Sequence, residues 1–289
     1  MHDLKWIARL FNGETRRQDR RRRKSGFTSN LDVIESALSV FGVSSANYWR
    51  YPELTYQSAN RFPSQLLQLL TRLGLIQDAD GIADIEAFAA ETAESADALP
   101  LGGLFDAHGS DKTRHGYHVA YAAILQKLAL NGPPAILEIG LGTNDKRLVS
   151  SMGKGGVPGA SLRAFRDFLP AANIYGADID PNILFREERI KTAFVDQTRP
   201  ETFDEMIRSL GTEAFDLIID DGLHSVEANM NTLLFALLKL KPGGWVVIED
   251  IPERTVVVWK SVVGLLNLTH FKARLVKAET AHMVVAERL

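Results

Sequence analysis

The segment PAILEIGLGTND, residues 134–145, constrains the fold of this chain more than any other stretch. Its apolar run AIL predicts a buried strand that ends at Glu138. Gly140 and Gly142 follow, and because glycine lacks a Cβ, the backbone N–H groups of such a turn can approach a ligand closely. The segment therefore predicts a strand followed by a cofactor-binding turn.

Four further strand patterns follow this turn, and stretches long enough for a helix separate them. They are residues 174–178, 191–196, 215–220 and 244–249. The glycine turn lacks the third glycine of the dinucleotide fingerprint, because Asp145 stands at that position. The alternation of strands and helices predicts an α/β fold with a Rossmann-like sheet, preceded by a helical region.

Composition excludes several classes of site. The chain has 289 residues, of which 45% are hydrophobic, and this is enough for one large domain and a smaller one. It contains no cysteine, which excludes disulfides, thiolate nucleophiles and cysteine-ligated zinc. No apolar stretch approaches the roughly 20 residues that span a bilayer, and the apolar run near the N-terminus is too short and too charged for a signal peptide. A cytoplasmic location, with or without attachment to a membrane surface, is expected.

The charge is distributed unevenly along the chain. Residues 1–24 hold nine Lys or Arg against three acidic residues, a balance of +6, although the whole chain has a net charge of −3. We therefore expect a basic tail over residues 1–26. A solvated tail is the favoured interpretation, and binding to an anionic membrane surface or to nucleic acid is the alternative.

A helical auxiliary region is expected over residues 27–100, and the main domain over residues 101–289. Apolar spacing predicts helices from Leu31, from Pro63 and over residues 84–98, with a linker at residues 98–103. The apolar faces of these helices must be buried. Homo-oligomerisation, covering of the substrate entrance and packing on the main domain all remain open.

Acidic residues gather after the fourth and fifth strands. Asp220, Asp221 and His224 follow one strand, and Glu249 and Asp250 end the next. Neighbouring strands lie about 4.8 Å apart and ligands bind at their carboxyl ends, so these carboxylates should converge and repel one another. A divalent cation, Mg²⁺ before Mn²⁺ or Ca²⁺, would relieve that repulsion. His224 would then serve as a general base, although each residue taken alone has an ordinary capping role.

The segment FDAHGSDKTRHGYHVAY, residues 105–121, is dense in polar and aromatic side chains. Lys112, His115 and Tyr117 are the candidates for contacting the substrate or closing the site. Helix capping and surface polarity are the ordinary alternatives.

From about residue 104 onwards the chain resembles the class I S-adenosylmethionine-dependent methyltransferases. The motifs ExGxG, the acid that ends the second strand, FDLIxxD and LKPGGWVVxxD occur in that family's order. The resemblance implies a seven-stranded sheet closed by a hairpin of residues 271–276 and 282–287. It also implies a set of cofactor-binding residues, namely Glu138, Gly140, Gly142, Asp178 and Asp196. Asp220, which the resemblance leaves ambiguous, is placed with them as a further candidate. Asp178 would hold the ribose and Asp196 would lie near the adenine.

A closer resemblance lies in the spacing DxxH followed by an adjacent Glu-Asp pair after LKPGG. This is similar to the metal-dependent sugar O-methyltransferases of macrolide biosynthesis, the mycinamicin type. It implies S-adenosylmethionine and Mg²⁺ as cofactors, Asp221, Glu249 and Asp250 as metal ligands, His224 as general base, and a small-molecule or glycan acceptor. A GSDK…HGY segment also occurs in bacterial sugar O-methyltransferases, where it helps close the site. Residues 1 to about 95 do not align with the macrolide family. The alternatives are a catechol or phenolic diol as acceptor, or a methyltransferase that uses the basic tail on nucleic acid or membranes.

Overall fold

The computed structural model describes residues 39–41, 52–76, 81–93 and 97–289. Contacts divide the chain into two compact units, Met1–Gln68 and Leu69–Leu289. The basic tail of residues 1–26 and most of the helix expected from Leu31 lie outside the described residues. The hypotheses about membranes, nucleic acid and oligomers therefore stay predictions. None of the described helices is long and apolar enough to cross a membrane.

The first described helix shows that one boundary prediction is wrong. After a 3-10 turn, η1 (Ser39–Phe41), helix α4 runs over Pro52–Arg72, so Pro63 lies inside it rather than at its start. Proline has no N–H to donate to the carbonyl of Ala59. The neighbouring Asn60 and Arg61 are exposed, so water can reach this turn and hydrate the freed carbonyl.

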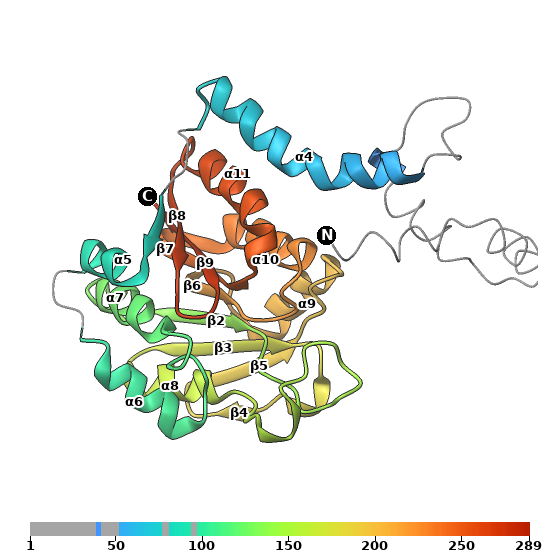
Figure 1. The fold of residues 1–289 in the computed structure, drawn as a ribbon. Coiled ribbons are helices and arrows are strands. Elements are labelled where there is room, and N and C mark those ends of the chain that lie inside the picture. Colours follow the sequence, from blue (N-terminus) through green and yellow to red (C-terminus); the bar gives the residue numbers. More distant parts are fainter. Residues whose placement is uncertain (1–38, 42–51, 77–80, 94–96) are drawn as a thin grey trace, which may run out of the picture. The chain divides into compact units, whose positions relative to one another are not determined.

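The described residues of the second unit build a sheet of nine strands (Figure 1). Its order is β1-β8-β9-β7-β6-β2-β3-β5-β4. The strands are β1 (Ile82–Asp84), β2 (Ala135–Ile139), β3 (Asn173–Asp178), β4 (Arg186–Glu187), β5 (Ile190–Phe194), β6 (Phe215–Asp220), β7 (Leu240–Ile251), β8 (Phe271–Lys277) and β9 (His282–Arg288). Strands β7, β6, β2, β3 and β5 are parallel, and β8 and β9 form the expected antiparallel hairpin beside β7.

Two of the nine strands were not expected from the sequence. The short β4 pairs with β5 at one edge, and β1 pairs in parallel with β8 at the other. The helix expected over residues 84–98 instead begins one residue later and ends earlier, as α5 (Ile85–Thr92). β1 is only three residues long and forms by pairing with β8, a strand almost 200 residues further along the chain, so no local pattern marks it.

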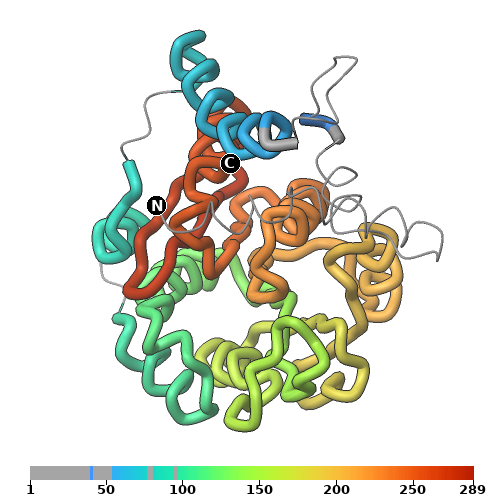
Figure 2. The backbone as a smooth tube through the Cα atoms, turned by 45° about the vertical axis from the view of Figure 1, so that its right-hand side comes forward, coloured from blue at the N-terminus to red at the C-terminus, as the bar shows by residue number. Residues whose placement is uncertain are grey.

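Helices cover both faces of the sheet, as the two views in Figures 1 and 2 show. One apolar cluster holds residues of α5, α6 (Leu99–His108), α7 (Tyr117–Ala129) and α8 (Ala160–Phe168). The other holds residues of α9 (Glu201–Leu210), α10 (Val226–Lys239) and α11 (Val256–Leu266). Short 3-10 turns lie at η3 (Gly153–Gly155), η4 (Pro181–Ile183) and η5 (Glu253–Thr255).

The expected linker at residues 98–103 is also wrong, because these residues begin helix α6. Leu101 and Phe105 are fully buried, and the Phe105 ring meets the Phe165 ring of α8 edge to face, with centroids 5.3 Å apart. The buried apolar side chains of this segment favour a packed helix instead of a linker. Helix α6 therefore belongs to the layer of helices that packs on one face of the sheet.

Candidate functional site

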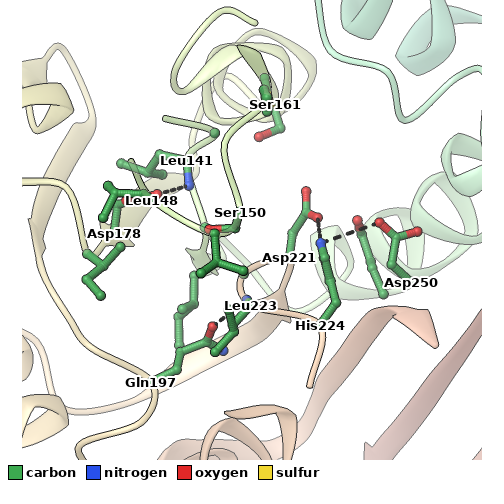
Figure 3. A pocket seen from close by; sticks show the side chains of 18 of the residues that line it. Leu141, Leu148, Ser150, Ser161, Asp178, Gln197, Asp221, Leu223, His224 and Asp250 are labelled. Atoms are coloured by element: carbon green, nitrogen blue, oxygen red, sulfur yellow. Dashed lines mark hydrogen bonds and ion pairs between the residues drawn. The ribbon is translucent and has the colours of Figure 1, made fainter. Parts of the chain in front are cut away.

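A cavity of about 380 Å³ opens at the carboxyl ends of the parallel strands. It is lined from the glycine turn after β2, from the ends of β3, β6 and β7, and from residues 195–198 after β5. Figure 3 shows Asp178 and Leu141 on one side of this cavity and Asp221, His224 and Asp250 on another. The site thus lies at the sheet edge where the sequence places it.

The glycine turn packs directly against the end of β6. Gly140 has φ +100°, and a Cβ added there would lie 1.9 Å from the carbonyl oxygen of Asp221. Gly142 has φ +81°, and its added Cβ would lie 2.2 Å from the Sδ atom of Met152. Both glycines line the cavity, so the expected close backbone turn is present.

Two acids of the expected cofactor side also line the cavity. Asp178 accepts hydrogen bonds from the backbone N–H groups of Leu141 (2.7 Å) and Asp180 (2.8 Å), which fix the carboxylate at the end of β3. Burial raises the pKa of Asp178, although these N–H groups oppose the shift. Asp196 accepts hydrogen bonds from the backbone N–H and the hydroxyl of Thr198.

Two other predicted cofactor residues lie beneath the cavity and do not line it. Asp220 is fully buried, and its Oδ1 accepts a hydrogen bond of 2.8 Å from Gln197, whereas its Oδ2 has no hydrogen-bond partner among the residues that the structure describes. Glu138 is fully buried and accepts a hydrogen bond from the Ser161 hydroxyl. Ser161 lies in the first turn of helix α8, where Gly159 holds the cap position, so the hydroxyl of Ser161 is available to bond Glu138.

The strongest chemical grouping combines His224 with two carboxylates. His224 Nε2 lies 3.8 Å from Asp221 Oδ1 and 3.6 Å from Asp250 Oδ2 (Figure 3). Among the described residues, these three offer ligand atoms that all lie within 4.8 Å of one another. His224 and Asp250 have φ of 54° and 53°, in the left-handed region that non-glycine residues rarely adopt. Such strain is typical of functional sites.

Lys112 lies behind this group and contacts Glu249. Its Nζ is 2.6 Å from Glu249 Oε2, 2.8 Å from Asp221 Oδ2 and 3.1 Å from Glu138 Oε1. Burial raises the pKa of Glu249 well above its ordinary range, and the charges of Asp221 and Glu138 add to the shift, whereas Lys112 opposes it. The carboxylate of Glu249 faces Lys112 at 2.6 Å and lies outside the three-residue group above.

The other two candidates from the polar segment lie at the cavity itself. The Tyr117 hydroxyl donates a hydrogen bond of 2.5 Å to Asp250 Oδ1, and burial raises the pKa of Tyr117 far above its ordinary value, with the charges of Glu249 and Asp250 adding to the shift. The His115 ring stacks on the Tyr117 ring, with centroids 5.5 Å apart. Both residues line the cavity.

Sequence reasoning missed two side chains that hold the site. The Gln197 side chain joins Asp220 to the loop after β6, because its Oε1 accepts a hydrogen bond from the backbone N–H of Leu223. The Tyr121 hydroxyl donates a hydrogen bond to Glu249. Tyr121 could have been found from its spacing, because it stands four residues after Tyr117 and therefore on the same helix face.

The chain matches known proteins over part of its length. The model of a methyltransferase domain matches residues 155–251. The chain is 33% identical over 162 residues to the 8-demethyl-8-alpha-L-rhamnosyl tetracenomycin-C 2'-O-methyltransferase of Streptomyces olivaceus, covering 55% of this chain and 39% of the relative. It is 42% identical over 93 residues to the mycinamicin VI 2''-O-methyltransferase of Micromonospora griseorubida, covering 32% and 23%. The matches thus span less than half the length of these relatives.

A solved structure is also similar. The MycE methyltransferase from the mycinamycin biosynthetic pathway, in complex with Mg and SAH, has 29% sequence identity and a TM-score of 0.44. The match covers 52% of this chain and 39% of that one.

Proposed function

We propose that this chain, which carries a class I S-adenosylmethionine-dependent methyltransferase domain, methylates a hydroxyl group of a sugar or glycoside. The names of the two relatives support this acceptor class, since both describe O-methylation of a glycosylated natural product. The observation that carries the proposal is the position of His224 Nε2 between Asp221 and Asp250. This group lines the same cavity as the glycine turn and Asp178.

The cavity residues fit S-adenosylmethionine. Gly140 lets the glycine turn lie against the backbone of Asp221 and still line the cavity, where the turn can contact the methionine part of the cofactor. The two oxygens of Asp178 each accept one backbone N–H and keep further lone pairs, which suit the two ribose hydroxyls. Asp196 lines the same end of the cavity and is the candidate for the adenine side.

The acidic side of the cavity fits one divalent cation. Carboxylate oxygens of Asp221 and Asp250 face each other across His224, and oxygen ligands are those that Mg²⁺ prefers. Glu249 stays in the proposed ligand set, because its carboxylate keeps lone pairs beyond those used by Lys112 and Tyr121. Tyr117 holds Asp250 in place through its hydroxyl.

When bound, S-adenosylmethionine supplies the methyl group and Mg²⁺ makes the acceptor hydroxyl more acidic. His224 takes the hydroxyl proton at Nε2. The carboxylates of Asp221 and Asp250, 3.8 and 3.6 Å away, stabilise the imidazolium that results. Leu141 and Leu148 add apolar surface to the wall of the same cavity.

The test compares His224→Asn with wild type in a methyl-transfer assay on a panel of glycosides and catechols. Loss of a general base should lower kcat by about 10²- to 10⁴-fold while binding of S-adenosylhomocysteine is retained. His270→Asn is the matched control, because His270 is exposed and its ring contacts Phe271, outside the cavity. An unchanged kcat for His224→Asn would remove the base from the proposal, and turnover of catechols alone would overturn the glycoside assignment.

Calorimetry tests the metal separately. Mg²⁺ is titrated into protein saturated with S-adenosylhomocysteine, for wild type, Asp221→Ala and Asp250→Ala. We expect wild type to take up one ion and both variants to lose it. Binding of the cofactor product without any metal uptake in wild type would contradict the metal assignment and leave the cofactor assignment intact.

A further inference from the structure

Of the three candidates from the polar segment, His115 and Tyr117 line the cavity, whereas Lys112 lies beneath it. Lys112 is 1% exposed, and its ammonium group lies within 3.1 Å of carboxylates from three different places in the chain. Glu138 comes from β2, Asp221 follows β6 and Glu249 comes from β7. Lys112 therefore joins the ends of three parallel strands that are neighbours in the sheet.

The charges around Lys112 do not balance. A buried ion is ordinarily paired with one opposite charge, because each unpaired ion costs several kcal/mol of desolvation. Here one ammonium meets three carboxylates, and Asp250 adds a fourth on the cavity side. When all of these carboxylates are ionised, the single positive charge of Lys112 cannot balance them, and a divalent cation bound beside the group would favour their ionised forms.

Asp221 connects Lys112 to the cavity. Its Oδ2 lies 2.8 Å from Lys112 Nζ, and its Oδ1 faces His224 Nε2 at 3.8 Å. One carboxylate thus offers one oxygen to the buried cation and the other to the proposed metal position. Carboxylates with this arrangement bridge the two cations of two-metal sites, in which the ions lie about 3.5–4 Å apart.

We propose that Lys112 takes the place of a second metal ion and, by doing so, positions Asp221 and Glu249 for a single divalent cation. The inference rests on the proposed function only in assigning that cation to Asp221 and Asp250. Two hydroxyls from the same segment complete the arrangement, because Tyr117 bonds Asp250 and Tyr121 bonds Glu249. Residues 112–121 thus hold all three predicted metal ligands.

The test counts metal ions in the full chain saturated with S-adenosylhomocysteine. Lys112→Ala removes the ammonium group and leaves space among three carboxylates. We expect the variant to take up one more Mg²⁺ or Mn²⁺ than wild type in calorimetry, and its Tm to rise more steeply with metal concentration. Ethylammonium in the buffer should return the ion count to that of wild type. Lys127→Ala is the matched control, because Lys127 pairs with Glu287 outside this group, and its ion count should not change.

An ion count and a metal dependence of Tm equal to those of wild type would overturn the inference. If Lys112→Ala does not fold, the charge-balanced variant Lys112→Met with Glu138→Gln decides instead. It should fold and bind the wild-type number of ions, whereas its failure to fold would also overturn the inference. If wild type binds no ion but Lys112→Ala binds one, the proposed metal fails and the role of Lys112 stands.

Discussion

Gly140→Ala tests the close approach of the glycine turn to the end of β6. The added Cβ would lie 1.9 Å from the carbonyl oxygen of Asp221, 2.4 Å from its carbonyl carbon and 2.9 Å from the Cα of Gly222. All three are backbone atoms, so no side chain can rotate away. Ordinary contact begins at 3.4 Å, and the difference from 1.9 Å means that the two backbones must separate by 1.5 Å.

The expected loss of stability in Gly140→Ala has two separable causes. Placing a side chain at a φ of +100° costs about 1–3 kcal/mol, and overpacking against a fixed neighbour costs about 1–3 kcal/mol more. We therefore expect Gly140→Ala to lower the free energy of unfolding by about 2–6 kcal/mol. The displacement also moves the backbone of Asp221, a proposed metal ligand, and a misplacement of about 1 Å can lower the rate about 10²-fold.

Gly211→Ala is the matched control for this experiment. Gly211 has φ +72° and no atom within 4 Å of an added Cβ, so its substitution costs only the backbone strain, about 1–2 kcal/mol. Gly142→Ala should lie between the two, because its Cβ meets the flexible end of Met152. Urea unfolding of the three variants gives the order directly. Equal losses for Gly140→Ala and Gly211→Ala would refute the steric argument.

Two further predictions concern the body of the domain. Asp167→Asn should lower the free energy of unfolding at pH 7 by at most about 1 kcal/mol, because Asp167 is a surface group. The neighbouring Arg166, with a smaller contribution from His108, lowers the pKa of Asp167 to about 2. This folded-state pKa lies below the ordinary value of 3.8, so the stabilisation by the Asp167 carboxylate is present above about pH 4 and is lost as the pH falls toward 2. Urea unfolding curves of the variant and the wild type should converge over that range. A difference in stability that persists at pH 2 would contradict this role of Asp167. Trp259→Ala removes a side chain that is 1% exposed and should lower the free energy of unfolding by about 3–5 kcal/mol in the same measurement. A loss below about 1 kcal/mol would mean that neighbouring side chains move in to fill the space left by the indole ring.

The gathering of acidic residues at the ends of β6 and β7 could be predicted from the sequence, because it depends on local patterns. The runs FDLIID and GWVVIED each mark a buried strand and the acid that follows it. Carboxyl ends of parallel strands meet at one edge of a sheet. Asp221, His224 and Asp250 accordingly lie together in the structure.

The orientation of neighbouring acids could not be predicted in the same way. Asp220 and Asp221 are adjacent, and only the second lines the cavity. Successive side chains of a strand point to opposite faces, but the loop after β6 decides where this alternation stops. Gln197, which fixes that loop, belongs to another part of the chain.

The contacts of Lys112 could not be predicted from the sequence either, because its partners lie far away along the chain. Its carboxylate partners Asp221 and Glu249 stand 109 and 137 residues away. The polar segment predicted that Lys112 carries a function, but its composition says nothing about which carboxylates it meets. The cavity-facing position expected for it depended on packing of helix α7 and the segment before it, which no local spacing encodes.

The two shortest strands determine how much unpaired backbone the edges of the sheet expose to other molecules. Strand β1, with three residues, and strand β4, with two, form its two edges, and each pairs with only part of the longer strand beside it. A fragment that began at residue 101 would lose β1 and would uncover the three residues of β8 with which it pairs, Leu275, Val276 and Lys277, so that all seven residues of β8 would form an open edge. It would also lose Phe88, whose ring packs on Trp245. Open strand edges beside newly exposed aromatic surface are sites of aggregation, so we expect the fragment to aggregate more than a fragment that keeps residues 82–92.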